Sequence, residues 1–167
     1  MTSGIERAVR SMPHSWPRAP DITKDCGPYQ LQAMLAAAGH EVDIASLRPP
    51  WGHFGYLLPW KVPVLLARHG GISAKTRYRL EPSDLRWYLL GALTRGHPTM
   101  LIIRATRGRH GLHWISVWGY DPEEGFQVYD SQYESREGGV GNTVFTPEFI
   151  SSRLHTHVRT LVEIDLP

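Results

Sequence analysis

After Gly96 the pattern of apolar residues changes from mainly helical to mainly strand-like, and this change constrains the fold more than any other feature. Upstream, "KVPVLLARHGG" and "SDLRWYLLGALTRGHP" are typical of helices, the second capped by Ser83 and Asp84, and "ISAKTRYR" predicts a strand between them. Downstream, "TMLIIRA", "HWISVWGY" and "GFQVYDS" are rich in β-branched and aromatic residues. "TPEFISSRLHTH" then predicts a late helix and "VRTLVEI" a closing strand. This order indicates an α+β domain with helices packed on a mainly antiparallel sheet.

The length and composition favour one folded domain. A chain of 167 residues with 41% apolar and 20% charged residues has the balance of a globular protein. We expect residues 1–20, which include the proline-rich "MPHSWPRAP", to be a flexible segment, and residues 21–167 to form the domain. The sequence contains neither a signal-peptide core nor an apolar run of about 18 residues, so we expect a cytoplasmic protein without a membrane partner. Its single cysteine cannot form an internal disulfide, which suits a reducing compartment.

Charge and metal-ligand patterns exclude several functions. The 18 basic and 16 acidic residues are too balanced to indicate a polyanion partner. "RATRGRH" is interpreted as a solvated loop, with nucleic-acid contact through Arg104, Arg107 and Arg109 as the alternative. His155 and His157 have the spacing of a zinc-binding pair on a strand, but no third ligand stands out. There is no glycine-rich phosphate loop, and we expect neither a metal nor an organic cofactor.

The only cysteine stands where a helix is expected to begin, in "KDCGPYQLQAMLAAAGH". Asp25 suits the N-cap, Pro28 is tolerated only in the first turn, and Gly39 suits the end. The apolar positions on one face of this helix are Leu31, Met34, Leu35 and Ala38. Backbone N–H groups at a helix N-terminus stabilise a thiolate, so Cys26 is a candidate nucleophile. Its alternative role is that of a small buried packing residue.

Two candidates for the partners of a nucleophilic cysteine occur late in the chain. His113 opens the strand "HWISVWGY", and Asp130 ends the next strand, "GFQVYD". The turn residues in "DPEEG" predict a hairpin, which would place the imidazole and the carboxylate side by side. A base held by a third group is what a cysteine nucleophile requires. His110, close to His113, is the rival for the base.

The stretches "DCGPYQLQAML", "GHPTMLII" and "HWISVWGYDPEEGFQVYDSQ", in this order, resemble the papain-like cysteine peptidases of the bacteriocin-processing kind. That family comprises the double-glycine-leader peptidases and their free-standing relatives, and the resemblance covers Asp25 to about Gln132. It implies a papain-like fold and a triad of Cys26, His113 and Asp130. It also implies hydrolysis of an amide in a peptide or protein substrate through an acyl-enzyme, without a cofactor. An acyl transferase or a deamidase would use the same triad.

One position departs from the family, whose members usually have a glutamine a few residues before the cysteine that helps to form the oxyanion hole. Six residues upstream of Cys26 this chain has Pro20, and Gln30 and Gln32 lie downstream, within the expected helix. The backbone N–H of Cys26 is then the surest donor. Unsupported substitutes are Thr23, Lys24 and Asn142. Losing one oxyanion donor typically costs ~100-fold to ~1000-fold in rate, so a peptide-binding module with impaired catalysis is the alternative function.

A substrate cleft is predicted beside Cys26. Its candidate residues are Asp25, Gly27, Trp51 and Trp114. Gly27 is included because a residue without a side chain allows a substrate backbone to approach closely. The aromatic residues Trp51, Phe54, Tyr56 and Trp60 are candidates for either the cleft wall or the core. Trp114 and Trp118, four residues apart in a strand, are expected to face the core together.

Overall fold

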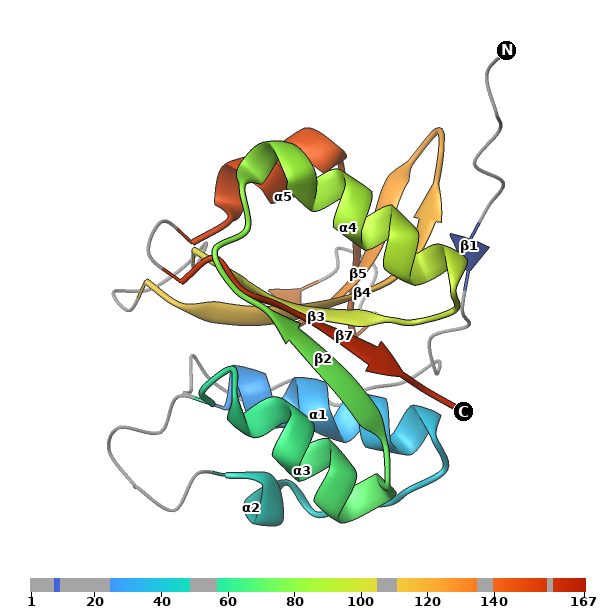
Figure 1. The fold of residues 1–167 in the computed structure, drawn as a ribbon, viewed down its shortest axis with the longest axis vertical. Helices are drawn as coiled ribbons and strands as arrows, with labels where there is room; N and C mark the ends of the chain where they lie inside the picture. The colour runs from blue at the N-terminus through green and yellow to red at the C-terminus, as the bar shows by residue number, and fades with distance from the viewer. Residues whose placement is uncertain (1–7, 10–24, 49–56, 105–110, 135–139, 156–157) are drawn as a thin grey trace.

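In a computed structural model of the chain, one sheet lies between two layers of helices (Figure 1). The residues described are 8–9, 25–48, 57–104, 111–134, 140–155 and 158–167. Helices α1, α2 and α3 cover one face of the sheet, and α4 and α5 cover the other. The helices are α1 (Cys26–Ala37), α2 (Ile44–Leu47), α3 (Lys61–Gly70), α4 (Pro82–Thr94) and α5 (Pro147–Arg153). The strands are β1 (Ala8–Val9), β2 (Ser73–Arg77), β3 (Thr99–Ile103), β4 (His113–Asp121), β5 (Gly125–Glu134), β6 (Val140–Phe145) and β7 (Leu161–Asp165).

Within the described residues, the strands form one antiparallel sheet in the order β2-β7-β3-β4-β5-β6, with β1 paired to β4. The predicted α+β arrangement with a mainly antiparallel sheet is confirmed. The hairpin predicted at "DPEEG" joins β4 to β5, and the Asp121 carboxylate accepts hydrogen bonds from the backbone N–H groups of Glu123 and Glu124 in its turn. Strand β1, which pairs Ala8 with Tyr120, was not predicted and lies in the segment expected to be flexible. Neither α2 nor β6 was predicted.

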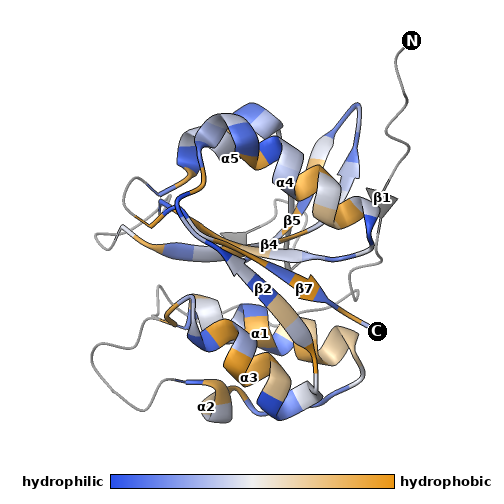
Figure 2. Ribbon diagram, in the orientation of Figure 1, coloured by the Kyte–Doolittle hydropathy of each residue, from blue (hydrophilic) through white to orange (hydrophobic). Residues whose placement is uncertain are grey.

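Successive side chains of a strand point to opposite faces of the sheet. Because helices cover both faces, these side chains pack in two separate cores. In β3, Met100 and Ile102 pack in the core beneath α1 and α3, whereas Leu101 and Ile103 pack in the core beneath α4. All five residues of β3 are therefore buried, which explains its continuous apolar sequence. The helices on both sides carry hydrophobic and hydrophilic residues, as elements covering a sheet must (Figure 2).

Helix α1 begins at Cys26, as predicted, and buries the expected apolar face. Leu31, Met34 and Leu35 are fully buried against the sheet. Asp25 occupies the N-cap position, but the predicted side-chain cap is not formed. Its carboxylate instead accepts two hydrogen bonds from the Arg48 guanidinium, at 2.8 and 3.2 Å, because a bidentate ion pair is stronger than a bond to a neutral amide.

The start of α4 also differs from the prediction. The helix begins at Pro82, after Glu81 in extended conformation, rather than at the expected caps Ser83 and Asp84. Proline is favoured at the first helical position because its φ is already helical and because an N–H at that position would have no acceptor within the helix. The end agrees with the sequence, since Gly96 adopts a φ of +77° just beyond Arg95. In the described part of the chain, none of the helices is both long and apolar enough to cross a bilayer.

Candidate active site

Cys26 is the first residue of α1, and its thiol is almost fully buried, with 3% of the residue exposed. The sulfur accepts a hydrogen bond from the backbone N–H of Trp114 in β4, with a nitrogen to sulfur distance of 3.5 Å. The N–H groups of the first helical turn have no acceptor within the helix. Cys26 therefore lies at the N-terminus of α1, with a backbone donor from β4 at its sulfur.

His113 and Asp130 form a buried pair on the hairpin β4–β5. The His113 Nε2 lies 2.6 Å from the Asp130 Oδ1, and the two side chains are 2% and 3% exposed. The pairing of Ser116 with Tyr129 in the two strands brings these residues within reach of each other. A short contact between buried polar groups holds the imidazole in one orientation.

The second ring nitrogen of His113, Nδ1, does not contact Asp130. Nδ1 is buried and forms no hydrogen bond of normal geometry within the described residues. Burial by itself lowers the pKa of this imidazole, but the hydrogen bond to Asp130, the proximity of the Cys26 thiol and the charges of both raise it to about 10. His113 therefore carries its proton at neutral pH, beside the thiol and tied to the carboxylate.

The predicted cleft residues have different surroundings from those expected. A Cβ on Gly27 would lie 2.5 Å from the Leu57 Cβ and 3.0 Å from the Trp114 Cδ1, so this chain's own side chains fill the space that was assigned to a substrate. The Trp114 indole is buried and donates to the Leu57 carbonyl at 2.9 Å. Asp25 pairs with Arg48. Trp51 lies outside the described residues. Gly27 and Trp114 thus pack the segment at Leu57 against the start of α1.

Trp114 is one of the residues that line a groove of about 540 Å³. Its lining comprises residues 57–60 and 158–160 together with Tyr78, Arg79, Ile102, Leu112 and Trp114. Trp60 and Tyr78 are more than half exposed at 55% and 54%, and Arg79 has a φ of +57°, which is uncommon for a residue with a side chain. Trp60 was a sequence candidate for a cleft wall. Tyr78 and Arg79 were missed because they follow β2, far from Cys26 in the sequence.

Gln30 is the buried polar residue next to this site that sequence reasoning set aside. It lies one turn after Cys26, is fully buried and bonds to the side chain of Ser116 in β4. A glutamine between the apolar residues of a helix face is the signal that marks it, because a buried amide must find partners. As expected, Trp114 and Trp118 both pack in the core on the α1 side of the sheet.

Of the other residues considered from the sequence, some lie outside the described residues and the rest have structural contacts. Those wholly outside are His110, Pro20, Thr23, Lys24, Phe54, Tyr56, Arg107, Arg109 and His157. Arg104 donates to the Ser152 carbonyl, and the Nδ1 of His155 accepts from the Val158 N–H. Asn142 is in β6 and pairs with Tyr129. In the described ranges, no three histidine, cysteine or carboxylate side chains are grouped so as to hold a metal ion.

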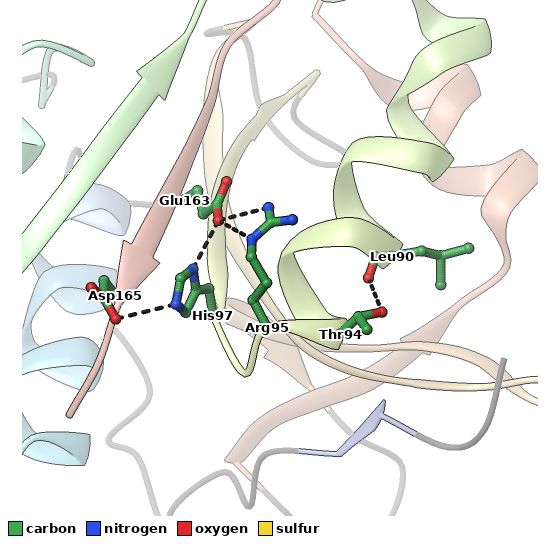
Figure 3. Close-up of polar contacts among 6 residues, drawn as sticks. All are labelled: Leu90, Thr94, Arg95, His97, Glu163 and Asp165. Atoms are coloured by element: carbon green, nitrogen blue, oxygen red, sulfur yellow. Dashed lines mark hydrogen bonds and ion pairs between the residues drawn. The ribbon is translucent and has the colours of Figure 1, made fainter.

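A second histidine and carboxylate cluster lies where α4 meets β7 (Figure 3). The Nδ1 of His97 is 2.8 Å from the Glu163 Oε1, and its Nε2 is 3.1 Å from the Asp165 Oδ1. Arg95 donates from Nε and Nη2 to the same Glu163 oxygen, at 3.0 and 2.8 Å. Burial alone would raise the pKa of Glu163, but the bonds and charges of His97 and Arg95 prevail and lower it. No sequence motif indicated this cluster.

The fold is similar to that of solved peptidase structures. A protein from Bacillus anthracis described as a C39-like peptidase matches with a TM-score of 0.67 at 14% sequence identity, over 96% of this chain and 98% of that one. A double glycine motif protease from an AMS/PCAT transporter, solved in complex with the leader peptide, matches with a TM-score of 0.60 at 17% identity, over 93% and 94%. No protein-family model and no curated protein matches the chain. The chain thus has the papain-like fold of C39-like peptidases, which confirms the predicted fold class.

Proposed function

We propose that this chain is a cysteine hydrolase that cleaves peptide amides with Cys26, His113 and Asp130. The observation that carries the proposal is the convergence of three elements: a cysteine at the start of α1, a histidine at the start of β4 and an aspartate in β5. The contact between His113 and Asp130 and the bond from the Trp114 N–H to the Cys26 sulfur support these roles. Likeness in fold to peptidases is consistent with them.

In the first step, the Cys26 sulfur attacks the carbonyl carbon of a peptide bond, and the electron pair of the carbonyl moves to oxygen. The raised pKa of His113 keeps a proton on the imidazole, which favours the thiolate of its neighbour by charge attraction. When the C–N bond breaks, His113 gives this proton to the departing amine. Cys26 is left as a thioester, and Asp130 keeps the imidazole oriented.

In the second step, one water molecule hydrolyses the thioester. The neutral His113 takes a proton from the water molecule while the water oxygen attacks the thioester carbon. Breakage of the C–S bond releases the carboxylic acid and returns the thiolate and the imidazolium. The oxyanion that forms in both steps needs fixed donors, and backbone N–H groups at the start of α1, including that of Cys26, are suited to this role.

The groove beside Trp114 supports a peptide as the substrate. Peptide side chains are recognised by apolar walls that carry a few polar groups, and the lining of this groove combines the exposed aromatic rings of Trp60 and Tyr78 with the charged Arg79. We therefore expect cleavage to favour peptides with an apolar or aromatic side chain near the scissile bond. Hydrolysis, transfer to another amine and deamidation share the thioester and differ only in the attacking or departing group.

The test is digestion of a mixed synthetic peptide library by the wild type and by Cys26→Ala, with products identified by mass spectrometry. We expect wild-type cleavage at a restricted set of sites and a loss of at least about 1000-fold in Cys26→Ala. Because the chain has one cysteine, trapping of a thioester by mass reports on Cys26 alone. Cleavage that persists in Cys26→Ala would overturn the proposal. Peptide binding without turnover in the wild type would support the binding module instead.

A further inference from the structure

The side chain of Gln30 is an amide buried in the apolar core between α1 and the sheet. It is 0% exposed, and its neighbours on the helix, Leu31 and Met34, belong to that core. Burying an amide without partners is unfavourable because its hydrogen bonds to water are lost, so a buried glutamine is expected to have partners in the protein. The position is one turn beyond Cys26 on the same helix.

The amide of Gln30 binds both strands of the hairpin. Its Oε1 accepts from the Ser116 hydroxyl at 2.5 Å, and its Nε2 lies 3.4 Å from the Trp114 carbonyl and 3.3 Å from the Tyr129 carbonyl. The Ser116 oxygen is held in turn by the Trp118 indole N–H at 2.7 Å. The hydrogen bonds of Gln30 thus involve the side chains of Ser116 and Trp118 in β4 and the backbone of both β4 and β5.

The two carbonyls are those of the residues next to the proposed base and its orienting group. Trp114 follows His113, and Tyr129 precedes Asp130. One side chain therefore connects the helix that begins at Cys26 to the backbone beside His113 and to the backbone beside Asp130. A misplacement of reactive groups by about 1 Å can cost about 100-fold in rate, so such a connection matters for reactivity.

We propose that Gln30 is a positioning residue that holds the start of α1 in register with the hairpin, so that Cys26 and His113 stay within reach of each other. This role rests on the proposed function. Gln32, two residues later, provides a matched control: its Nε2 donates to the Val42 carbonyl at 3.0 Å, away from the hairpin. Both glutamines lie in the same helix, but only Gln30 joins it to the strands.

The test measures how strongly His113 controls the reactivity of Cys26. Iodoacetamide alkylation at pH 7 is followed by mass in the wild type, Gln30→Met and Gln32→Met, each with and without His113→Ala. We expect His113→Ala to slow the wild-type reaction by about 10-fold or more. This ratio should fall below about threefold in Gln30→Met and keep its wild-type value in Gln32→Met. Near-ultraviolet circular dichroism identifies the variants that are folded.

The outcomes separate this role from the proposed function. An undiminished ratio in folded Gln30→Met would overturn the positioning role and leave the triad intact. A wild-type rate that is indifferent to His113 would overturn the triad, and the role of Gln30 with it. If Gln30→Met does not fold, a second variant keeps the test decisive. Ser116→Ala removes the donor to the Gln30 Oε1, together with the acceptor of the Trp118 indole N–H, and must lower the ratio relative to Gln32→Met. An unchanged ratio in folded Ser116→Ala would also refute the role.

Discussion

Two buried or half-buried histidines contact carboxylates in this molecule, and their surroundings differ in one respect. His97 has a carboxylate at each ring nitrogen, Glu163 at Nδ1 and Asp165 at Nε2, whereas His113 has Asp130 at Nε2 only. Both nitrogens of His97 thus face a carboxylate oxygen, at 2.8 and 3.1 Å. The Nδ1 of His113 forms no normal hydrogen bond within the described residues. The Cys26 thiol is close enough to this imidazole to help raise its pKa.

The comparison teaches that a histidine and carboxylate pair is not by itself a reactive site. At the α4–β7 junction, Arg95 also binds Glu163 through Nε and Nη2, so both nitrogens of His97 and two of Arg95 face carboxylate oxygens, and the cluster ties a helix end to a strand (Figure 3). At the hairpin, the contact with Asp130 orients the imidazole and leaves Nδ1 without a hydrogen bond in the described residues, as the proposed proton transfer requires. Satisfied groups stabilise, and an oriented group with one open position can react.

The largest expected effect is on the rate of peptide cleavage when each of the two histidines is replaced. His113→Gln should lower peptide cleavage by about 1000-fold or more, because it removes the group that exchanges the proton. His97→Gln should stay within about twofold of the wild type, since His97 contacts Glu163 and Asp165 and not Cys26. Steady-state cleavage of one library peptide measures both. Equal losses in two folded variants would refute the division between reactive and structural histidines.

A smaller effect is expected at the carboxylates. Asp130→Asn should lower the rate of cleavage by less than His113→Gln does, because an amide of the same shape still holds the ring, as in Cys-His-Asn triads, but removes the charge that stabilises the imidazolium. The Michaelis constant should change little, since Asp130 does not face the groove lining. Asp165→Asn is the matched variant at the other cluster and should leave the rate unaltered. A rise confined to the Michaelis constant of Asp130→Asn would instead place Asp130 in substrate binding.

The sequence predicted the hairpin that carries His113 and Asp130, because its strands alternate clearly and "DPEEG" marks the turn. It also predicted the start of α1 at Cys26. It did not predict that Leu57 would pack against Gly27, since that contact joins segments thirty residues apart and depends on the fold. The cluster of Arg95 with Glu163 was hidden for the same reason: its partners come together only when β3, which follows Arg95 and His97, pairs with β7 and sets Thr99 opposite Glu163.

The two clusters should respond to pH with opposite signs. The pKa of His113 is raised from 6.5 to about 10, so its contribution to stability is complete below pH 6.5 and is lost as the pH rises through about 10. The pKa of Glu163 is lowered from 4.5, so its contribution is complete above pH 4.5 and is lost as the pH falls through the folded value. Urea unfolding across pH should show a weaker alkaline loss in His113→Gln and a weaker acid loss in Glu163→Gln. The same pH dependence in both variants would contradict these assignments.

The smallest effect concerns stability at neutral pH and separates the two carboxylates of His97. Glu163→Gln should lower the free energy of unfolding by about 1 to 3 kcal/mol, because the side chain is only 11% exposed and its charge is bonded to Arg95 and His97. Asp165→Asn should change it by less than about 0.5 kcal/mol, since that side chain is 64% exposed and water screens its contact with His97. Urea titration at pH 7 measures both values. Equal losses would mean that the exposed contact holds the helix end as firmly as the buried one, and that burial does not decide which of these charges stabilises the fold.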